Sequence, residues 1–166
     1  MADGRERSYS WADPFAVLAG LQGLSGLETM RRVASGELPQ PPIADTLGFR
    51  LVEAEPGVAV FACEPAEFHY NPIGTVHAGL ACTLLDSAMG CAFVTTLEEL
   101  LPWTTLELKA NFTRALTVDT GTVRCTGSVL HRGRTVVTTE ARLVDGAGRL
   151  CAHGTSTILV LANGAR

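Results

Sequence analysis

The chain has 166 residues, of which 46% are hydrophobic and 18% are charged, and its formal net charge is −4. This length fits one domain with a short appendage, and the composition excludes a disordered chain, which needs few hydrophobic residues and much charge. The negative charge argues against a nucleic-acid binder, and a charged fraction below the usual value of about 25% suggests that some surface is buried against another subunit.

The N-terminal part of the chain has a helical pattern. Residues 11–36 repeat apolar side chains every three to four positions, and Asp13-Pro14 is a typical helix start. The glycines at positions 20, 23 and 26 predict a break, which leaves a firmer helix over residues 27–35. Residues 38–45 (LPQPPIAD) are predicted to form a proline-rich connector.

Beyond the connector the period of the pattern changes. Residues 48–65 alternate around Glu55-Pro56-Gly57, which predicts a two-stranded hairpin, and residues 67–79 have the composition of a loop. The one strong helix follows, over residues 79–95. Because this helix is apolar on almost every face, we expect it to be buried on nearly all sides.

The chain is strand-like from Pro102 to its end. The strand predicted over residues 104–114 alternates, and its apolar face carries Leu106, Leu108, Ala110 and Phe112. Thr105 falls on the opposite, polar face. Three more strands are predicted over residues 120–131, 135–145 and 149–161, with tight turns between the last three strands.

This order of elements indicates an α+β fold. We predict an antiparallel sheet of about six strands that packs around the one long helix, whose small residues permit a close approach. The predicted division is a helical N-terminal extension over residues 1–38 and one domain over residues 39–166.

Two further features concern the cellular setting. No run of about 18 apolar residues is present, and the N-terminus lacks the apolar core of a signal peptide, so neither a membrane span nor secretion is expected. The five cysteines are widely spaced without a CxxC pair, which predicts buried thiols in a reducing cytoplasm and no metal site. They are Cys63, Cys82, Cys91, Cys125 and Cys151.

Asp86 is the one charged residue between Leu80 and Val94. Aspartate is unfavourable inside a helix, and burial of an unpaired carboxylate is costly. One interpretation is a structural residue that faces solvent or bonds a neighbouring loop. The interpretation that we favour is a general base or a nucleophile.

His77 directly precedes the same helix, followed by Ala78 and Gly79. These two residues are expected to present free backbone N–H groups at a helix N-terminus, where they would stabilise a developing oxyanion. His77 and Asp86 are nine positions apart, which is half a turn out of phase and about 13 Å along the axis. We therefore expect a site between two subunits, each of which supplies one half.

Charge is divided unevenly along the chain. Eight acidic residues and no lysine or arginine lie between Arg50 and Lys109, whereas eight basic and three acidic residues are found from Lys109 onward. An anion bound through side chains should therefore meet the second half of the chain, although ordinary scatter of surface charge explains the pattern equally well.

The segment NPIGTVHAGLACTLLDSAMG, residues 71–90, resembles the signature of the PaaI-like acyl-CoA thioesterases of the hotdog-fold superfamily. That signature has Asn, Gly, His-Gly-Gly and then Asp nine residues after the His; here these are Asn71, Gly74, His77-Ala78-Gly79 and Asp86. The resemblance extends over about residues 40–161. It implies a hotdog fold and a homodimer with two sites at the interface, which often pairs into a homotetramer.

The resemblance also implies hydrolysis of an acyl-CoA thioester to a free acid and CoA. Asp86 would be the general base or the nucleophile, and Asn71 would orient the attacking water or the carboxylate. The backbone N–H near Ala78, with His77 beside it, would polarise the thioester carbonyl. Ala78 stands where the family commonly has Gly, and its methyl group would narrow the acyl pocket or mark a less active subgroup.

Other candidates follow from the same resemblance. Thr105 matches a hydroxyl that assists the carboxylate, with Thr104 as its competitor if the register differs by one. Substrate-binding candidates are Gly79 at the helix start and three arginines that suit the 3′-phosphate of CoA, namely Arg114, Arg132 and Arg134. Phe68, Tyr70 and Trp103 would suit the lining of the acyl pocket. Packing in the hydrophobic core explains each of them equally well. No cofactor and no metal are implied.

Two alternative functions remain at this point. A hotdog enoyl-CoA hydratase or dehydratase also pairs a histidine with an acid, but it needs the histidine as its acid–base group, and Asn71 with Asp86 fits hydrolysis better. A non-catalytic acyl-CoA-binding module would leave Asp86 with a structural role.

Overall fold

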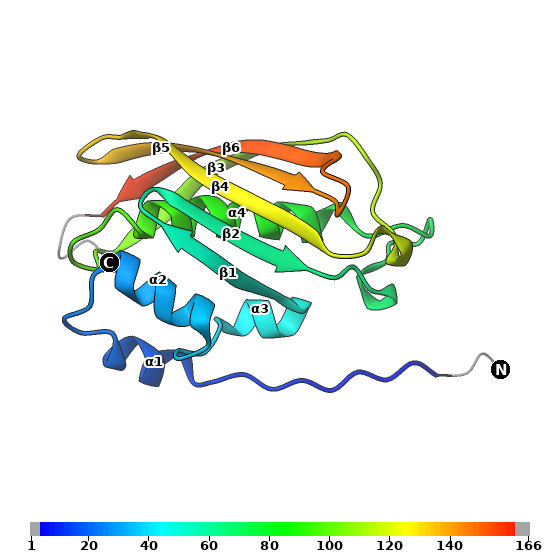
Figure 1. Cartoon of the computed structure of the whole chain (residues 1–166), viewed down its shortest axis with the longest axis horizontal. Coiled ribbons are helices and arrows are strands. Elements are labelled where there is room, and N and C mark those ends of the chain that lie inside the picture. The colour runs from blue at the N-terminus through cyan, green and yellow to red at the C-terminus, as the bar shows by residue number, and fades with distance from the viewer. Residues whose placement is uncertain (1–3, 162–166) are drawn as a thin grey trace.

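The computed structural model describes residues 4–161, and these residues form a six-stranded antiparallel sheet around one long helix (Figure 1). The helices are α1 (Pro14–Gly20), α2 (Gly26–Ser35), α3 (Pro42–Leu47) and α4 (Ala78–Val94), with 3-10 turns at Glu67–His69 and Val118–Thr120. The strands are β1 (Phe49–Glu55), β2 (Val58–Cys63), β3 (Trp103–Phe112), β4 (Val123–Arg132), β5 (Val136–Val144) and β6 (Leu150–Val160). The ends of the two predicted regions, residues 1–3 and 162–166, lie outside the described residues.

The sheet has the strand order β1-β2-β4-β5-β6-β3, and every neighbouring pair is antiparallel. It curves around α4, which packs against β2, β4 and β5. The centre of α4 is fully buried, with 0% exposure at Leu84, Leu85, Ala88 and Met89. The α+β class and the sheet wrapped around one helix are therefore confirmed.

Small residues bring the sheet and α4 close together. A Cβ atom at Gly127 of β4 would lie 2.3 Å from the backbone of Ala88, so only glycine permits this approach. The burial of α4 is not uniform, because a stripe that includes Gly79, Thr83 and Asp86 is only half-buried within one chain. The prediction that the helix is buried on nearly all sides therefore holds except along this stripe.

The N-terminal extension contains the two predicted helices. Asp13 caps α1 by accepting a hydrogen bond from the N–H of Phe15 at 2.9 Å, and Ser25 caps α2 through the N–H of Glu28 at 3.2 Å. Gly23, with φ of 81°, lies in the break between them. The predicted connector differs from the structure at α3, because a proline fits the first turn of a helix and Pro42 starts one.

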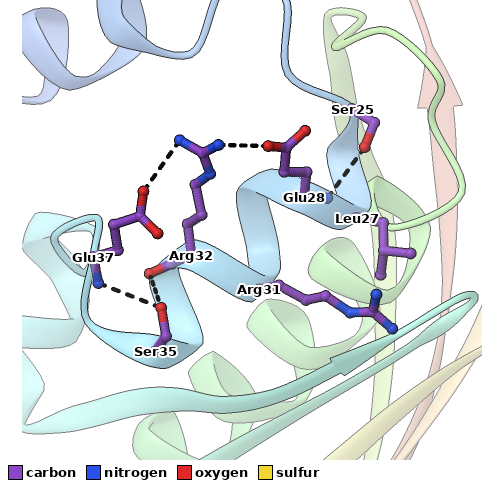
Figure 2. Close-up of a pocket in the computed structure, with 7 residues that line it drawn as sticks. All are labelled: Ser25, Leu27, Glu28, Arg31, Arg32, Ser35 and Glu37. Atoms are coloured by element: carbon purple, nitrogen blue, oxygen red, sulfur yellow. Dashed lines mark hydrogen bonds and ion pairs between the residues drawn. The ribbon is translucent and has the colours of Figure 1, made fainter.

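The outer face of α2 is held by ion pairs, as Figure 2 shows. Arg32 contacts Glu28 at 2.5 Å and Glu37 at 3.1 Å. At the start of the helix, the N–H of Gly26 donates to the carbonyl of Leu97 at 2.9 Å, just beyond the end of α4. The ion pairs stabilise α2 and the turn after it, while the hydrogen bond from Gly26 fixes the start of α2 against the C-terminal end of α4. The helix also packs along β1.

One prediction about β3 is wrong. A bulge between Thr105 and Glu107 shifts the register against β6, so Leu106 is the extra residue and is 55% exposed. Trp103 and Thr105 consequently lie on the inner face before the bulge, and Leu108 and Ala110 lie on it afterwards. The strict alternation that separated Thr105 from the inner face does not hold.

The two edges of the sheet differ. β1 is covered by α2 and α3, whereas β3 pairs with β6 on one side and with no strand of residues 4–161 on the other. In the described part of the chain, no helix is long and apolar enough to cross a membrane.

Candidate active site

Asp86 receives one hydrogen bond from a neighbouring strand. The hydroxyl of Thr105 donates to its Oδ1 atom at 2.9 Å, which is possible because the bulge in β3 turns Thr105 toward α4. The hydroxyl of Thr104 instead lies 3.4 Å from the carbonyl of Thr105, on the exposed face. Of the two threonines considered from the sequence, Thr105 is therefore the one that contacts the carboxylate.

The second oxygen of Asp86 is open. It accepts no hydrogen bond from residues 4–161, and no buried side-chain oxygen or nitrogen in that range lacks a partner, so this atom is reached by solvent. Asp86 also forms no ion pair with the described residues. One oxygen is thus held in place while the other is available to a water molecule or a substrate.

The start of α4 supplies a backbone donor. His77 is the N-cap, and its Nδ1 atom accepts the N–H of Gly79 at 2.8 Å. The expectation that Gly79 presents a free N–H is therefore wrong, since the imidazole already occupies it. The N–H of Ala78 has no acceptor among the described residues, and Ala78 is exposed. This free donor at a helix N-terminus is suited to a developing negative charge.

Asn71 shapes the loop before α4. Its Oδ1 atom accepts the N–H groups of Ile73 and Thr75 at 3.0 and 3.2 Å, and its Nδ2 atom donates to the hydroxyl of Thr75 at 3.0 Å. Within one chain these contacts keep Asn71 in its own loop and away from Asp86. Its hydrogen bonds support the turn that carries the chain toward His77.

A cavity of about 340 Å³ opens beside the free N–H of Ala78. His77, Ala78 and Arg114 all line it, so one of the three arginines singled out from the sequence lies at the helix start. Sequence reasoning missed other residues of its walls, among them Phe112, Leu116 and Cys151. The one sequence feature that could have pointed to these residues is their position near the ends of predicted strands, where side chains commonly border functional sites.

The other two arginines lie elsewhere. The guanidinium of Arg132 is 5.0 Å from the ring centre of Phe93, which belongs to the last turn of α4, and Arg134 is exposed in the β4–β5 turn. Within one chain these two arginines are therefore not brought together with Arg114.

The described residues include no cluster of three His, Cys, Asp or Glu side chains that could hold a metal ion. The five cysteines are all free thiols. Burial raises the pKa of Cys125 to about 12, and burial together with the Asp86 charge raises the pKa of Cys91 to about 12. These thiols therefore stay protonated at neutral pH and are poor nucleophiles.

Comparison with known proteins decides the family. The sequence profile of the Thioesterase superfamily matches residues 73–152. Human acyl-coenzyme A thioesterase 13 is 32% identical over 108 residues, which are 64% of this chain and 76% of the human protein. The chain belongs to the thioesterase superfamily.

This thioesterase is PaaI-like, and it is a thioester hydrolase with the hotdog fold. A thioesterase-like, phenylacetic-acid-degradation-related protein from Ralstonia eutropha JMP134 is 28% identical, covers 79% of this chain and 98% of its own, and superimposes with a TM-score of 0.70. The E. coli PaaI protein, at 19% identity, shows the same fold with a TM-score of 0.71 over 83% of this chain and 97% of its own. A 1,4-dihydroxy-2-naphthoyl-CoA hydrolase from Listeria monocytogenes is 26% identical over 71% of this chain and 94% of its own.

The matched profile contains the residues at both parts of the site. His77, Ala78, Asp86 and Thr105 lie within residues 73–152, while Asn71 and the N-terminal extension lie outside that range. In this thioesterase the free N–H of Ala78 and the carboxylate of Asp86 are eight residues apart on one continuous helix, a rise of about 12 Å. Within one chain, the two groups are therefore not brought together.

Proposed function

We propose that this thioesterase hydrolyses acyl-CoA thioesters at sites formed between two subunits. Each site takes the Asp86–Thr105 pair from one subunit and the helix start at Ala78 from the other. The observation that carries the proposal is the state of the two oxygens of the Asp86 carboxylate. One accepts a hydrogen bond from Thr105, and the other is accessible to solvent.

The chemistry follows from these two groups. As a general base, the open oxygen of Asp86 takes a proton from a water molecule, whose oxygen attacks the thioester carbonyl. As a nucleophile, the same oxygen attacks the carbonyl and forms an anhydride that water then cleaves. In both routes the carbonyl oxygen gains negative charge, and the N–H of Ala78 stabilises it. The carbon–sulfur bond then breaks, the free acid forms, and the CoA thiolate leaves and takes up a proton.

The proposal assigns supporting roles to three further groups. His77 holds the first turn of α4 through Gly79, so that the N–H of Ala78 points outward. Asn71 fixes the loop before the helix and lies on the same half-site as Ala78. Arg114 lines the adjoining cavity, where its guanidinium suits a phosphate of CoA.

The geometry favours hydrolysis over the two alternatives. A hydratase needs the histidine as its acid–base group, whereas the Nδ1 atom of His77 holds the first turn of α4 and leaves only Nε2 for proton transfer. A binding module does not need a carboxylate with an open oxygen on a buried helix. The free edge of β3, which carries Thr105, is a natural place for two copies of the chain to meet as a homodimer, and such dimers can pair into a homotetramer.

The test measures thiol release from a panel of acyl-CoAs. We expect Asp86→Asn to lower kcat by about 10²–10⁴-fold, because it removes the ionised oxygen and keeps the shape of the side chain. Thr105→Val should give a smaller loss of about tenfold or more, since it removes one hydrogen bond to a charged group, while Thr104→Val serves as the matched control. The proposal fails if the wild-type protein releases no thiol from any acyl-CoA, or if Asp86→Asn retains wild-type activity.

A further inference from the structure

A second, larger cavity lies between the N-terminal extension and the central helix. Its volume is about 410 Å³, within the range of about 300–1,000 Å³ that is typical of small-molecule sites. α1, α2 and the proline-rich connector form one side, and α4, β1, β2 and Trp103 form the other. Its apolar walls include Val17, Leu21, Met30, Val33, Cys91 and Trp103.

The cavity lies beside the last turns of α4, beyond the candidate carboxylate. Cys91 is five residues after Asp86, a rise of about 7.5 Å and a rotation of about 140° around the helix axis, so the two side chains lie on different sides of α4. The Asp86 charge still contributes to the raised pKa of the Cys91 thiol. Trp103 is two residues before Thr105 on the inner face of β3, and its ring lies over Gly90, where a Cβ atom would be only 2.6 Å away. The indole of Trp103 thus lies between the Asp86–Thr105 pair and the cavity, and an acyl chain that enters the cavity from Asp86 has to pass along this ring.

The cavity offers almost no free polar group to an occupant. Thr29 is 2% exposed, and its hydroxyl donates to the carbonyl of Ser25 at 2.9 Å. The side-chain amide of Gln40 accepts the N–H of Leu51 at 3.0 Å and donates to the carbonyl of Val33 at 3.2 Å. Because both polar side chains of the wall are already bonded to backbone, an occupant with its own polar group would find no partner there.

The extension is built to hold this wall in place. The inner face of α2 supplies Thr29, Met30 and Val33 to the cavity, while its outer face carries the ion pairs of Arg32 that Figure 2 shows. At the start of α2, a Cβ atom on Gly26 would lie 1.8 Å from the carbonyl oxygen of Val94, so the helix rests directly on the end of α4. The contact with α4 thus fixes the position of the wall, while the ion pairs of Arg32 stabilise the helix itself, and a wall held in this way can select an occupant by size.

We propose that this cavity binds the acyl group of the substrate, and that α1 and α2 thereby make the enzyme selective for unsubstituted hydrocarbon acyl chains long enough to pass Trp103. This inference rests on the proposed function, because it takes the thioester carbonyl to lie at Asp86. Short acyl groups end before the cavity and gain nothing from it. Each methylene that enters it raises kcat/KM by about fourfold.

The test compares butyryl-CoA with octanoyl-CoA in a variant that fills the cavity. Val17→Trp places an indole in it from α1, whereas Ala16→Trp places the same ring on the exposed side of α1 and is the matched control. We expect Val17→Trp to lower kcat/KM for octanoyl-CoA by about tenfold or more and to leave butyryl-CoA within about twofold, with no change in Ala16→Trp. Leu21→Trp is a second filling variant, which is used if Val17→Trp lowers the thermal unfolding midpoint.

The outcomes separate the two levels of the inference. Equal effects of the filling variants on both substrates, or no effect on either, would overturn the assignment of the cavity while hydrolysis itself stands. An absence of thiol release from both substrates in the wild-type protein would overturn the proposed function. A third substrate, an eight-carbon acyl-CoA with a terminal carboxylate, should be hydrolysed far more slowly than octanoyl-CoA, and equal rates would also overturn the assignment.

Discussion

His77 closes the first turn of α4, and this contact decides which backbone N–H remains free. Its imidazole accepts the N–H of Gly79, and the N–H of Ala78 one position earlier is left free. Both residues looked equivalent in the sequence, because a free N–H is the default at any helix start. The difference arises from a side-chain rotamer, which the sequence pattern does not specify.

Substitution of Ala78 by proline tests the free donor directly. Proline replaces the N–H by the Cδ methylene of its ring, and it is tolerated at the first position of a helix, which Ala78 occupies. His77, with ψ of 133°, already has the extended backbone that a residue before proline requires. We therefore expect Ala78→Pro to fold normally and to lose about 10²–10³-fold in kcat, as measured by thiol release.

Ala78→Gly is the control for that variant. It keeps the N–H and restores the residue usual in the signature, so its kcat should stay within about threefold of wild type. Equal activity of Ala78→Pro and Ala78→Gly would exclude the N–H of Ala78 from catalysis.

His69 gives the fold a dependence on pH near neutrality. Burial lowers the pKa of His69, the hydrogen bond with the Leu47 carbonyl partly opposes this, and the charge of Arg7 lowers the pKa further. Its Nδ1 atom accepts the N–H of Ala66 at 3.0 Å, so the folded protein requires the neutral ring. Protonation is therefore easier in the unfolded chain, where the pKa is about 6.5.

The contribution of the neutral His69 ring to the free energy of unfolding should thus be fully present above about pH 7. It should decrease as the pH drops below about 6.5. A single proton limits the slope from this residue to about 1.4 kcal/mol per pH unit. Urea unfolding at pH 7.5, 6.0 and 5.0 measures it. His69→Gln should flatten the slope and His131→Gln, at an exposed position, should not; the same slope in all three proteins would contradict the assignment.

At the scale of elements, local signals gave most of the strands and helices. Pro56-Gly57 and the turns before and after β5 mark chain reversals by their residues alone, and the predicted hairpins are confirmed. The bulge at Leu106 was missed because it depends on how β3 pairs with β6, some 50 residues later in the chain. That pairing is what brings Thr105 to Asp86, so the alternation in β3 alone was misleading about the site.

The position of the N-terminal extension against the rest of the chain likewise could not be predicted from local sequence patterns. The helices over Pro14–Gly20 and Gly26–Ser35 were predicted from their spacing and caps. Their position depends on long-range contacts, such as the one between Gly26 and the carbonyl of Leu97. The cavity that they form with α4 therefore could not be located from the sequence.

The contact between β4 and α4 can be tested at Gly127. Gly127→Ala would place a methyl group 2.3 Å from the Ala88 backbone, so the helix must shift from the sheet, and we expect a loss of about 1–3 kcal/mol in the free energy of unfolding. Gly146→Ala is the matched control, since its nearest neighbour would be 3.8 Å away and its φ is not positive. Chemical unfolding of both variants measures the difference, and similar stabilities would show that α4 and β4 do not need the glycine.

At the scale of the whole molecule, one chain does not bring together the two groups that we propose for the reaction. Ala78 and Asp86 are about 12 Å apart along a single rigid helix, too far to act on one carbonyl. Closure of the gap by bending α4 would disrupt the best-packed part of the core, around Leu84 and Ala88. In the dimer that we propose, a second copy of the chain that meets the free edge of β3 would supply the missing half without any change of fold.

Mixed dimers test this directly, because a two-fold symmetric dimer has two sites that each draw on both chains. In a dimer of one Asp86→Ala chain and one Ala78→Pro chain, one site carries both defects and the other carries none. Random mixing makes about half of the dimers mixed, so about a quarter of the wild-type sites should be restored and thiol release should recover to about that level. A mixture of Asp86→Ala with Asp86→Asn chains is the control, since it restores no site. The mixed dimers are confirmed by differential tags. If they stay inactive while the control behaves as expected, each site must lie within one subunit. The separation of Ala78 from Asp86 would then require that only one of these two residues takes part in the reaction.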